Sequence, residues 1–445
     1  MTACAIEPTA EDGERDPEEG GRPAEEGGRG TGEDGDRTPP APLVITANGA
    51  YAARLALRGD CWFPERWTLD GPEPYAVPLP GNQPEEPGTQ VQPMADGQVL
   101  IHRREAGRHT FTLLYPTGPG TGEHPLGAID HRTAETGAGA DAGGDVELRL
   151  LPPAPCGTRA YALLVGRRSS ALWRVAGGAS GPERVAEVPG RCSGGVWLDR
   201  AGRMLALDRE TGGRTKAVVV DLGRGGEVSP LLQIADGSDD RLLLADPDSG
   251  LLLIGSDAPS PGEPRLGWGV LGSTLPVRFP ESLRLPGCTL TPFAVQPGQV
   301  LLPESCAVAL RVDGPLGTWV GTWRPADRRL RQCAAPEGWL TGSGLWTADG
   351  ELRLPYATPA APCGVARVPA PEQGPAPCGV ARVPAPERGP EPGPGAVSGP
   401  GPASPGSPDS RSAHRAWAAS GTPAEPSAPR PVPLQQAPLA RLVTN

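Results

Sequence analysis

Short apolar-rich runs of four to eight residues recur along the chain from Leu43 onward, separated by glycine or charged residues. The pattern is clearest in residues 191–236, which contain "SGGVWLD", "RMLALDR", "TKAVVVDL" and "VSPLLQI". Valine, leucine and isoleucine dominate these runs, and the separators "RAG", "ETGGR" and "GRGGE" are rich in turn-forming residues. Runs of this length and composition between turns are typical of β-strands. Residues 191–236 are therefore predicted to form one four-stranded antiparallel unit.

A turn glycine followed by an apolar run marks the same point in seven repeats of this unit. The intervals between these glycines are 48, 60, 45, 48, 48 and 52 residues. A period of about 40–50 residues, with about four short strands in each repeat, is typical of a β-propeller. We therefore predict an all-β fold, a seven-bladed β-propeller of four-stranded antiparallel blades. The seven glycines are Gly49, Gly97, Gly157, Gly202, Gly250, Gly298 and Gly350.

The predicted propeller covers residues 43–391. A loop-like insert, "RTAETGAGADAGGD" at 132–145, explains the 60-residue interval. In the sixth repeat "QVLLP" is interpreted as the second strand, and in the fifth repeat "ESLRLPG" as the fourth strand. A 15-residue unit occurs twice in tandem, at 362–376 and 377–391, and only one copy of its "GVARV" is expected to serve as a strand. In chain order, the blades are expected at about 43–81, 82–131, 145–190, 191–236, 237–287, 288–338 and 339–391.

Both ends of the chain depart from the strand pattern. Residues 1–42 are predicted to be a disordered acidic tail, with 12 acidic residues and 4 arginines in the first 38 positions. Residues 392–430 are rich in Pro, Gly, Ser and Ala and are predicted to be a disordered linker. Residues 431–445 contain "PVPLQQAPL", which is similar to "YAVPL", the outer-strand segment of the first repeat. We expect 431–445 to be the closing strand of the last blade.

The charge distribution narrows the classes of partner. The net charge is −11, and the first 38 residues carry −8 of it, so the body of the chain is nearly neutral. It contains no basic stretch of the kind that binds nucleic acid or a membrane surface. The single lysine, Lys216, stands against 40 arginines, which indicates the codon usage of a GC-rich bacterial genome more than phosphate binding. We expect a monomer that binds another protein or a peptide, with no nucleic-acid and no membrane partner.

The N-terminal sequence "MTACAIEPTAEDGERDPEEGG" has neither the basic nor the apolar region of a secretory signal. No apolar run approaches the ~20 residues that a membrane-spanning helix needs. A cytoplasmic location is therefore expected. The nine cysteines are scattered, without a C-x-x-C pair, and this favours reduced thiols over a disulfide framework or a zinc site.

Sequence motifs of common catalytic sites are absent: there is no G-x-x-x-x-G-K-[ST], no H-E-x-x-H and no G-x-S-x-G. The five histidines show no metal-ligand spacing. We expect no cofactor and no metal. Residues 246–250, "DPDSG", have the D-x-D-x-G start of a calcium loop, but "LLLIGS" follows and supplies no further ligands directly. A tight turn is therefore favoured over calcium binding.

Four tryptophans occupy matching positions in the third strands of repeats one, three, five and six. Large aromatic side chains at such repeated positions pack between neighbouring blades more often than they form a ligand cage. They are therefore expected to belong to the core. The four are Trp67, Trp173, Trp268 and Trp323.

Charged residues gather in two kinds of connection. If the strands of a blade are called a, b, c and d in chain order, the b–c and d–a connections share one rim of the propeller, and the a–b and c–d turns share the other. Propellers usually bind partners or ligands at such a rim, but loops are also polar simply because they face solvent, and both interpretations stay open. The candidate residues of the b–c/d–a rim are Arg58, Asp60, Arg103, Arg104, Glu105, Arg167, Arg168, Arg191, Asp208, Arg209, Asp239, Asp240, Asp257, Glu304 and Glu337.

Segments such as "WLDRAGRMLALDRETGGRTKAVVVDL" resemble blades of the β-propeller superfamily that includes WD40-like, YVTN-like and TolB-like repeats. The resemblance covers residues 43–391 and the last 15 residues, but no repeat carries the Gly-His and Trp-Asp pairs of true WD40 blades. It implies mainly a platform for protein contacts in a bacterial protein. Some relatives are hydrolases, lyases or lactonases, and others are the gating domains of prolyl-oligopeptidase-like peptidases. No second α/β domain is visible here to carry a nucleophile.

Two functions follow from this pattern. The favoured one is a non-enzymatic, cytoplasmic protein-interaction platform that uses the b–c/d–a rim. The alternative is a propeller enzyme, of the hydrolase, lyase or lactonase type, that binds a small ligand or a divalent metal in the central funnel. In that case the acid–base or metal-binding groups would be Asp239, Asp240, Glu304, Glu337 and Arg191.

Overall fold

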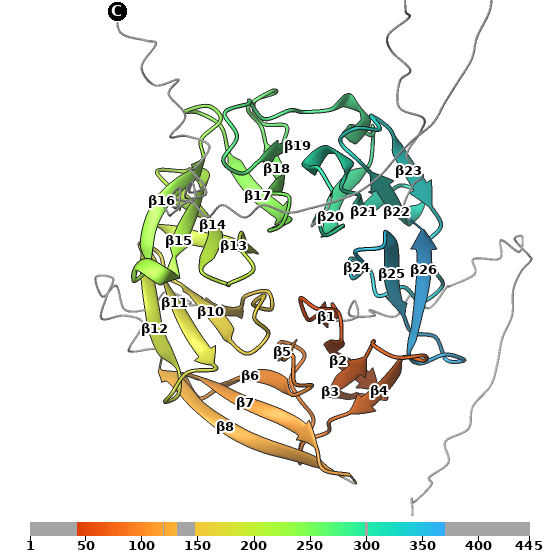
Figure 1. The fold of residues 1–445 in the computed structure, drawn as a ribbon. Coiled ribbons are helices and arrows are strands. Elements are labelled where there is room, and N and C mark those ends of the chain that lie inside the picture. Colours follow the sequence, from red (N-terminus) through yellow and green to blue (C-terminus); the bar gives the residue numbers. More distant parts are fainter. Residues whose placement is uncertain (1–41, 119, 131–146, 299–300, 370–445) are drawn as a thin grey trace, which may run out of the picture. The chain divides into compact units, whose positions relative to one another are not determined.

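The structure, a computed structural model, describes residues 42–118, 120–130, 147–298 and 301–369, all within the compact unit Pro40–Asn445 (Figure 1). In these ranges the regular structure consists of strands β1–β26 and three short 3-10 helices. None of these helices is long and apolar enough to cross a membrane. The predicted all-β fold is confirmed. The helices are η1 (Leu222–Arg224), η2 (Glu281–Leu283) and η3 (Pro303–Ser305).

The first three sheets are antiparallel, and within each one every strand pairs with the next along the chain. The first contains β1 (Val44–Ile45), β2 (Tyr51–Arg58), β3 (Cys61–Thr68) and β4 (Tyr75–Pro78). The second contains β5 (Gln90–Pro93), β6 (Val99–Glu105), β7 (Arg108–Pro116) and β8 (Thr121–Asp130). The third contains β9 (Glu147–Leu150), β10 (Ala160–Val165), β11 (Ser169–Ala176) and β12 (Glu183–Pro189).

The following strands form a seven-stranded sheet that consists of two antiparallel sets. The two sets are joined by a single parallel residue pair, Lys216 with Asp240. The first set is β13 (Arg191–Trp197), β14 (Met204–Thr211), β15 (Arg214–Asp221) and β16 (Glu227–Leu232). The second set is β17 (Asp240–Ala245), β18 (Leu251–Ser256) and β19 (Arg265–Val270). The last two sheets are β20 (Thr289–Val295), β21 (Val308–Gly314), β22 (Gly317–Trp323) and β23 (Leu330–Cys333), and then β24 (Leu345–Trp346), β25 (Glu351–Tyr356) and β26 (Gly364–Pro369).

Each set of strands contacts the next, and the last contacts the first, so that the sheets close a ring (Figure 1). At the closure Leu43, Ala52, Trp67 and Leu340 share one buried cluster, and the hydroxyl of Ser343 donates a hydrogen bond of 2.8 Å to the Leu43 carbonyl. Stacking buries both apolar faces of each sheet, which explains why the ring closes. The β-propeller is confirmed. The count of seven blades stays a prediction, because the described strands form six hydrogen-bonded sheets, one of them a double set.

The repeated turn glycines allow successive a–b turns to pack against one another. A Cβ atom at Gly157 would lie only 2.4 Å from the Cβ of Ala95, in the a–b turn of the preceding sheet. At the ring closure, a Cβ at Gly49 would lie 2.1 Å from the Leu345 side chain. Six of the seven predicted turn glycines also have positive φ, which glycine adopts without a steric penalty. The recurring glycines therefore serve the close packing of neighbouring repeats as well as the geometry of the turns.

The tryptophans of the third strands lie where the sequence predicts them. Trp67 in β3, Trp268 in β19 and Trp323 in β22 are buried, each in a cluster of apolar side chains. Trp173 in β11 is partly buried against the cluster between the second and third sheets. Their role as core residues is confirmed.

Two predicted strands are wrong. The sequence predicts a second strand at "QVLLP", but the second strand of its sheet is β21, and residues 301–305 belong to the preceding connection. Pro303 begins the helix η3 there, and the Leu302 side chain is 71% exposed, so this apolar run does not alternate between two faces of a sheet. "ESLRLPG" contains η2 instead of a fourth strand. Prolines at 280 and 286 remove backbone donors that a strand ladder would need.

Several predictions lie wholly or mainly outside the described residues. These are the acidic tail at 1–42, the insert at 132–145, the linker at 392–430 and the closing strand at 431–445. The first copy of the tandem unit supplies β26, whose segment Gly364–Pro369 includes the first "GVARV". The blade boundaries given above stay predictions.

Candidate functional site

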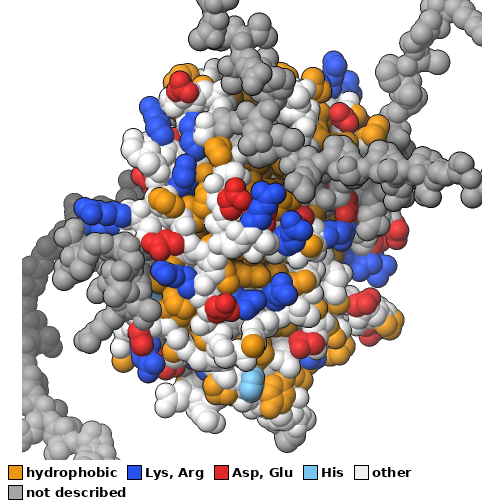
Figure 2. All heavy atoms as spheres, turned by 60° about the vertical axis from the view of Figure 1, so that its left-hand side comes forward, with side chains coloured by type: hydrophobic (Ala, Val, Ile, Leu, Met, Phe, Trp, Pro, Cys, Tyr) orange, Lys and Arg blue, Asp and Glu red, His pale blue; other side chains and the backbone are white. Residues whose placement is uncertain are grey.

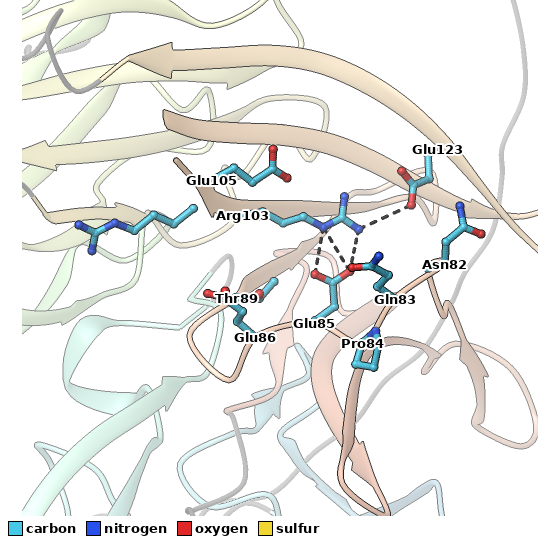
Figure 3. Close-up of a pocket in the computed structure, with 11 residues that line it drawn as sticks. Asn82, Gln83, Pro84, Glu85, Glu86, Thr89, Arg103, Glu105 and Glu123 are labelled. Carbon is cyan, nitrogen blue, oxygen red and sulfur yellow. Dashed lines mark hydrogen bonds and ion pairs between the residues drawn. The ribbon is translucent and has the colours of Figure 1, made fainter. Parts of the chain in front are cut away.

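A pocket of about 390 Å³ lies on the b–c/d–a rim, where the connection from β4 to β5 meets the end of β6 (Figure 3). β8 contributes one further side chain, that of Glu123. The pocket therefore brings together one d–a connection and one b–c connection, as the rim prediction requires. Its lining residues are Gly81, Asn82, Gln83, Pro84, Glu85, Glu86, Thr89, Arg103, Arg104, Glu105 and Glu123.

An ion pair between Glu85 and Arg103 forms the floor of this pocket. Arg103 Nη2 lies 2.7 Å from Glu85 Oε1, and Arg103 Nε lies 2.9 Å from Glu85 Oε2, so the pair is bidentate. The hydrogen bond with Glu85 raises the pKa of Arg103. The backbone amide of Glu85 donates a 2.8 Å hydrogen bond to the carbonyl of Trp62, which anchors the connection to the first sheet. Two-point pairing and partial burial fix the orientation of the guanidinium.

The remaining charged groups of the pocket are mostly carboxylates. Glu86, Glu105 and Glu123 are exposed, and Glu123 Oε1 also approaches Arg103 Nη2 at 3.6 Å (Figure 3). Four glutamates and two arginines line the pocket, which gives it a formal charge of −2. Because Glu85 and Arg103 already neutralise each other, the excess negative charge belongs to the exposed glutamates. Such a site attracts a cationic group, and it offers Asn82, Gln83 and Thr89 as hydrogen-bonding neighbours.

A second group of candidates lies where the β13–β16 set meets the β17–β19 set. Asp240 is fully buried and accepts hydrogen bonds from Lys216 Nζ at 2.7 Å, from the amide of Ile234 at 2.8 Å and from the hydroxyls of Ser238 at 2.8 Å and Ser256 at 2.6 Å. Burial alone would raise the pKa of Asp240, but these four bonds outweigh it and lower the pKa. The only lysine of the chain therefore holds two sets of strands together.

Three further candidate aspartates also bond to protein groups at this junction. Asp239 accepts from the amide of Thr215 at 2.7 Å, and Asp257 accepts from the amide of Asp239 at 2.7 Å. Asp208 accepts from the amide of Leu242 at 3.0 Å, and burial raises its pKa to about 6. These carboxylates fasten backbone segments across the junction.

The other candidates lie apart from both groups, except Arg209, which follows Asp208 in β14 and pairs across the strands with Lys216. Arg58 and Asp60 lie at the β2–β3 turn, Arg167 and Arg168 lie between β10 and β11, and Arg191 begins β13. Glu337 is exposed between β23 and β24. The structure therefore does not bring all fifteen candidates into one site.

Glu304 lies on the opposite rim, contrary to its expected place. It belongs to η3, in the a–b connection between β20 and β21, because the second strand of this sheet begins at Val308. It therefore cannot meet Asp239, Asp240 and Glu337 at a b–c/d–a mouth of the funnel, and the predicted convergence of these carboxylates is wrong in this respect.

The "DPDSG" segment is a turn. Asp246 accepts from the amide and the hydroxyl of Ser249, at 2.9 and 2.6 Å, and from the amide of Gly298 at 2.9 Å. Asp248 pairs with Arg200. Across the described ranges, no group of three or more His, Cys, Asp or Glu side chains is arranged to hold a metal ion.

Sequence reasoning found Arg103, Arg104 and Glu105 but missed Glu85, Glu86 and Glu123. Glu85 and Glu86 stand out in the sequence as the acidic segment "PEEPG" at 84–88, in the d–a connection that precedes the strand ending in "RRE" at 103–105. Only the fold brings the two segments together.

Figure 2 shows the molecule from the side on which β10–β16 come forward. Positive and negative side chains alternate over this face, with apolar side chains between them. On its strands, Arg174 pairs with Glu183 and Arg184 pairs with Glu187. No large patch of one sign is visible in this view.

Comparison with known proteins gives only remote likenesses. No family model matches the chain, and no curated protein sequence is significantly similar to it. Among solved structures, an oligogalacturonate lyase from Vibrio parahaemolyticus is 10% identical with a TM-score of 0.46, and the match covers 76% of this chain and 90% of the lyase. TolB from Acinetobacter baumannii is 12% identical with a TM-score of 0.39, and the match covers 76% of this chain and 87% of TolB.

A third solved structure is the β-propeller domain of the Trilobed protease from Pyrococcus furiosus, which is 10% identical with a TM-score of 0.43; the match covers 74% of this chain and 95% of that domain. These likenesses concern the fold and not the activity. The stacked antiparallel sheets and the contact of the last sheet with the first make this chain a β-propeller protein.

Proposed function

We propose that this protein is a non-enzymatic interaction platform that binds a protein or peptide partner on its b–c/d–a rim. The proposed contact point is the pocket between the β4–β5 connection and β6, and the proposed partner group is a lysine or arginine side chain. The formal charge of −2 on the pocket lining, with Arg103 already neutralised by Glu85, is the observation that carries this proposal.

The geometry supports recognition of a single side chain. A pocket of about 390 Å³ lies at the lower end of the range for small-ligand sites and is large enough for one long side chain with its hydration water. The bidentate pair fixes the floor, while Glu86, Glu105 and Glu123 remain exposed around it. A basic group that enters would gain charge-assisted hydrogen bonds without breaking the Glu85–Arg103 pair.

The test compares two blocked hexapeptides that differ only at a central position, arginine in one and glutamine in the other. Isothermal titration calorimetry should detect binding of the arginine peptide, weakened by added salt because the attraction is electrostatic. Glu86→Gln combined with Glu123→Gln should reduce the affinity about tenfold, since each substitution removes one exposed carboxylate from the pocket.

Glu337→Gln provides the matched control, because Glu337 is an exposed glutamate of the same rim that does not line the pocket. It should leave the affinity unchanged. Equal binding of the arginine and glutamine peptides would refute the proposed recognition, and so would equal losses in the pocket and control variants.

A further inference from the structure

A second pocket, of about 750 Å³, lies on the opposite rim between the β17–β19 set and the β20–β23 sheet. It is built from the segment that follows β19, from η3 and from the c–d turn between β22 and β23. Its lining contains Trp268, Arg278, Phe279, Pro280, Glu281, Ser282, Glu304, Pro325, Ala326 and Arg328. Its volume lies within the range of sites that enclose a small ligand or a short peptide.

The wall of this pocket is fixed by main-chain and aromatic contacts. Trp268 and Arg278 exchange backbone hydrogen bonds of 2.8 and 2.9 Å, so the segment after β19 runs beside that strand for one residue pair. The guanidinium carbon of Arg278 lies 4.9 Å from the centroid of the Trp268 ring. Gly267 leaves room for the ring of Phe279, since a Cβ there would lie 2.8 Å from it. The cation–π contact with Trp268 positions the Arg278 guanidinium without using up its hydrogen-bond donors.

Two arginines and two glutamates line the pocket, but one of the glutamates is already paired with an arginine outside the lining. Glu281 is paired with Arg265 at 2.7 Å. Arg278 and Arg328 form no ion pair with any described residue, and neither does Glu304. Two guanidinium groups and one carboxylate therefore line the pocket without an ion-pair partner among the described residues, beside the apolar surfaces of Phe279, Pro280 and Pro325.

We propose that this pocket binds a carboxylate carried on an apolar or aromatic body. Arg278, held over the Trp268 ring, would receive the carboxylate through its N–H groups, with Arg328 adding positive charge, while Phe279 and the two prolines would cover the apolar part. Glu304 would disfavour ligands of higher negative charge. The carboxylate can belong to a free organic acid or to an acidic peptide, and these two sources share the same recognition chemistry.

Three probes separate the chemistry and its source. N-acetylphenylalanine carries the free carboxylate, its amide is the neutral analogue, and a blocked tetrapeptide with adjacent phenylalanine and glutamate carries the side-chain form. Binding is followed by intrinsic tryptophan fluorescence and by calorimetry. We expect one or both carboxylate probes to bind at least about tenfold more tightly than the amide, because a charge-assisted pair is lost in the amide. The tighter carboxylate probe identifies the source.

Variants assign the effect to the pocket. Arg278→Gln should weaken the carboxylate probe about tenfold, and Glu304→Gln should tighten it a few-fold because it removes a like charge. Arg284→Gln is the matched control, since Arg284 is an exposed arginine close in sequence that does not line the pocket; it should change nothing. Arg278, Glu304 and Arg284 all lie in connections between strands. Unfolding curves are used to check that each variant is folded.

The proposal is overturned by equal affinities for acid and amide, by equal losses in Arg278→Gln and Arg284→Gln, or by the absence of binding of all three probes at 10 mM. It is independent of the platform proposed on the other rim, and each can fail alone.

Discussion

Asp240 shows how one buried carboxylate can hold two sets of strands together. Its side chain is fully buried and satisfied by four donors, including Lys216 of the adjacent set. Removing one member of a buried pair leaves the other charge desolvated without compensation. We expect Asp240→Asn to lower the free energy of unfolding by about 3 kcal/mol, measured by urea denaturation. Asp236→Asn, an exposed neighbour, should stay within about 0.5 kcal/mol of the parent, and equal effects would contradict the assignment.

A buried histidine pair gives the fold a pH dependence. His102 Nε2 lies 2.9 Å from His109 Nδ1, and burial together with the charge of His109 lowers the pKa of His102 to about 4. Because the unfolded chain binds this proton near pH 6.5 and the folded chain does not, stability must fall as the pH drops from 6.5 to 4. The loss for this group is about 3 kcal/mol.

Asp208 acts in the opposite direction, since its raised pKa, about 6, makes stability fall as the pH rises from 3.8 to 6. The measurement is therefore the difference between the parent and His102→Phe in urea denaturation across this range. The parent should lose stability relative to the variant as the solution is acidified. A difference that does not change between pH 7 and pH 4 would contradict a neutral buried His102.

The sequence predicts single residues well where a local pattern determines their place. The tryptophans of the third strands and the turn at Asp246 depend on local spacing, and both predictions hold. The pairing of Glu85 with Arg103 depends on two segments 18 residues apart that meet only after the sheet has formed. Glu304 was misplaced because one strand was misassigned, which transferred its connection to the wrong rim.

At the scale of the element, the a–b turns contact one another around the ring. Gly157 combines a positive φ of 68° with a Cβ position 2.4 Å from Ala95. Gly212 has a similar φ of 60° but nothing within 4 Å of its Cβ position, which makes it a matched control. Gly212→Ala should cost about 1 kcal/mol of backbone strain, and Gly157→Ala about 2–4 kcal/mol through strain plus overpacking, in urea denaturation. Equal costs would show that turn packing contributes nothing.

Strands were predictable where their residues are apolar throughout, or where apolar and polar residues alternate along the strand. "RMLALDR" and "TKAVVVDL" correspond to β14 and β15 within one or two residues. The errors fall on connections that contain apolar residues for other reasons. Leu301 packs onto the core beside η3, and Leu283 is buried from η2, so both segments have the hydrophobicity of strands without their ladder.

At the scale of the whole molecule, the ring gives two rims with different surroundings. The b–c/d–a rim holds a pocket with excess carboxylates, and the other rim holds a larger pocket with two arginines that form no ion pair with a described residue and with an aromatic wall. The repeat period predicted the architecture, and hence that these connections would gather at two rims. It could not predict which connections would enclose a pocket, because that depends on the length and path of each loop.

Hydrogen–deuterium exchange of the whole protein with and without the arginine hexapeptide tests the central claim most directly. The account predicts slower exchange in residues 81–90 and 103–108, which form and flank the acidic pocket, and unchanged exchange in residues 271–282 on the other rim. Protection confined to 271–282, or the same small change across the whole ring, would contradict partner binding on the b–c/d–a rim.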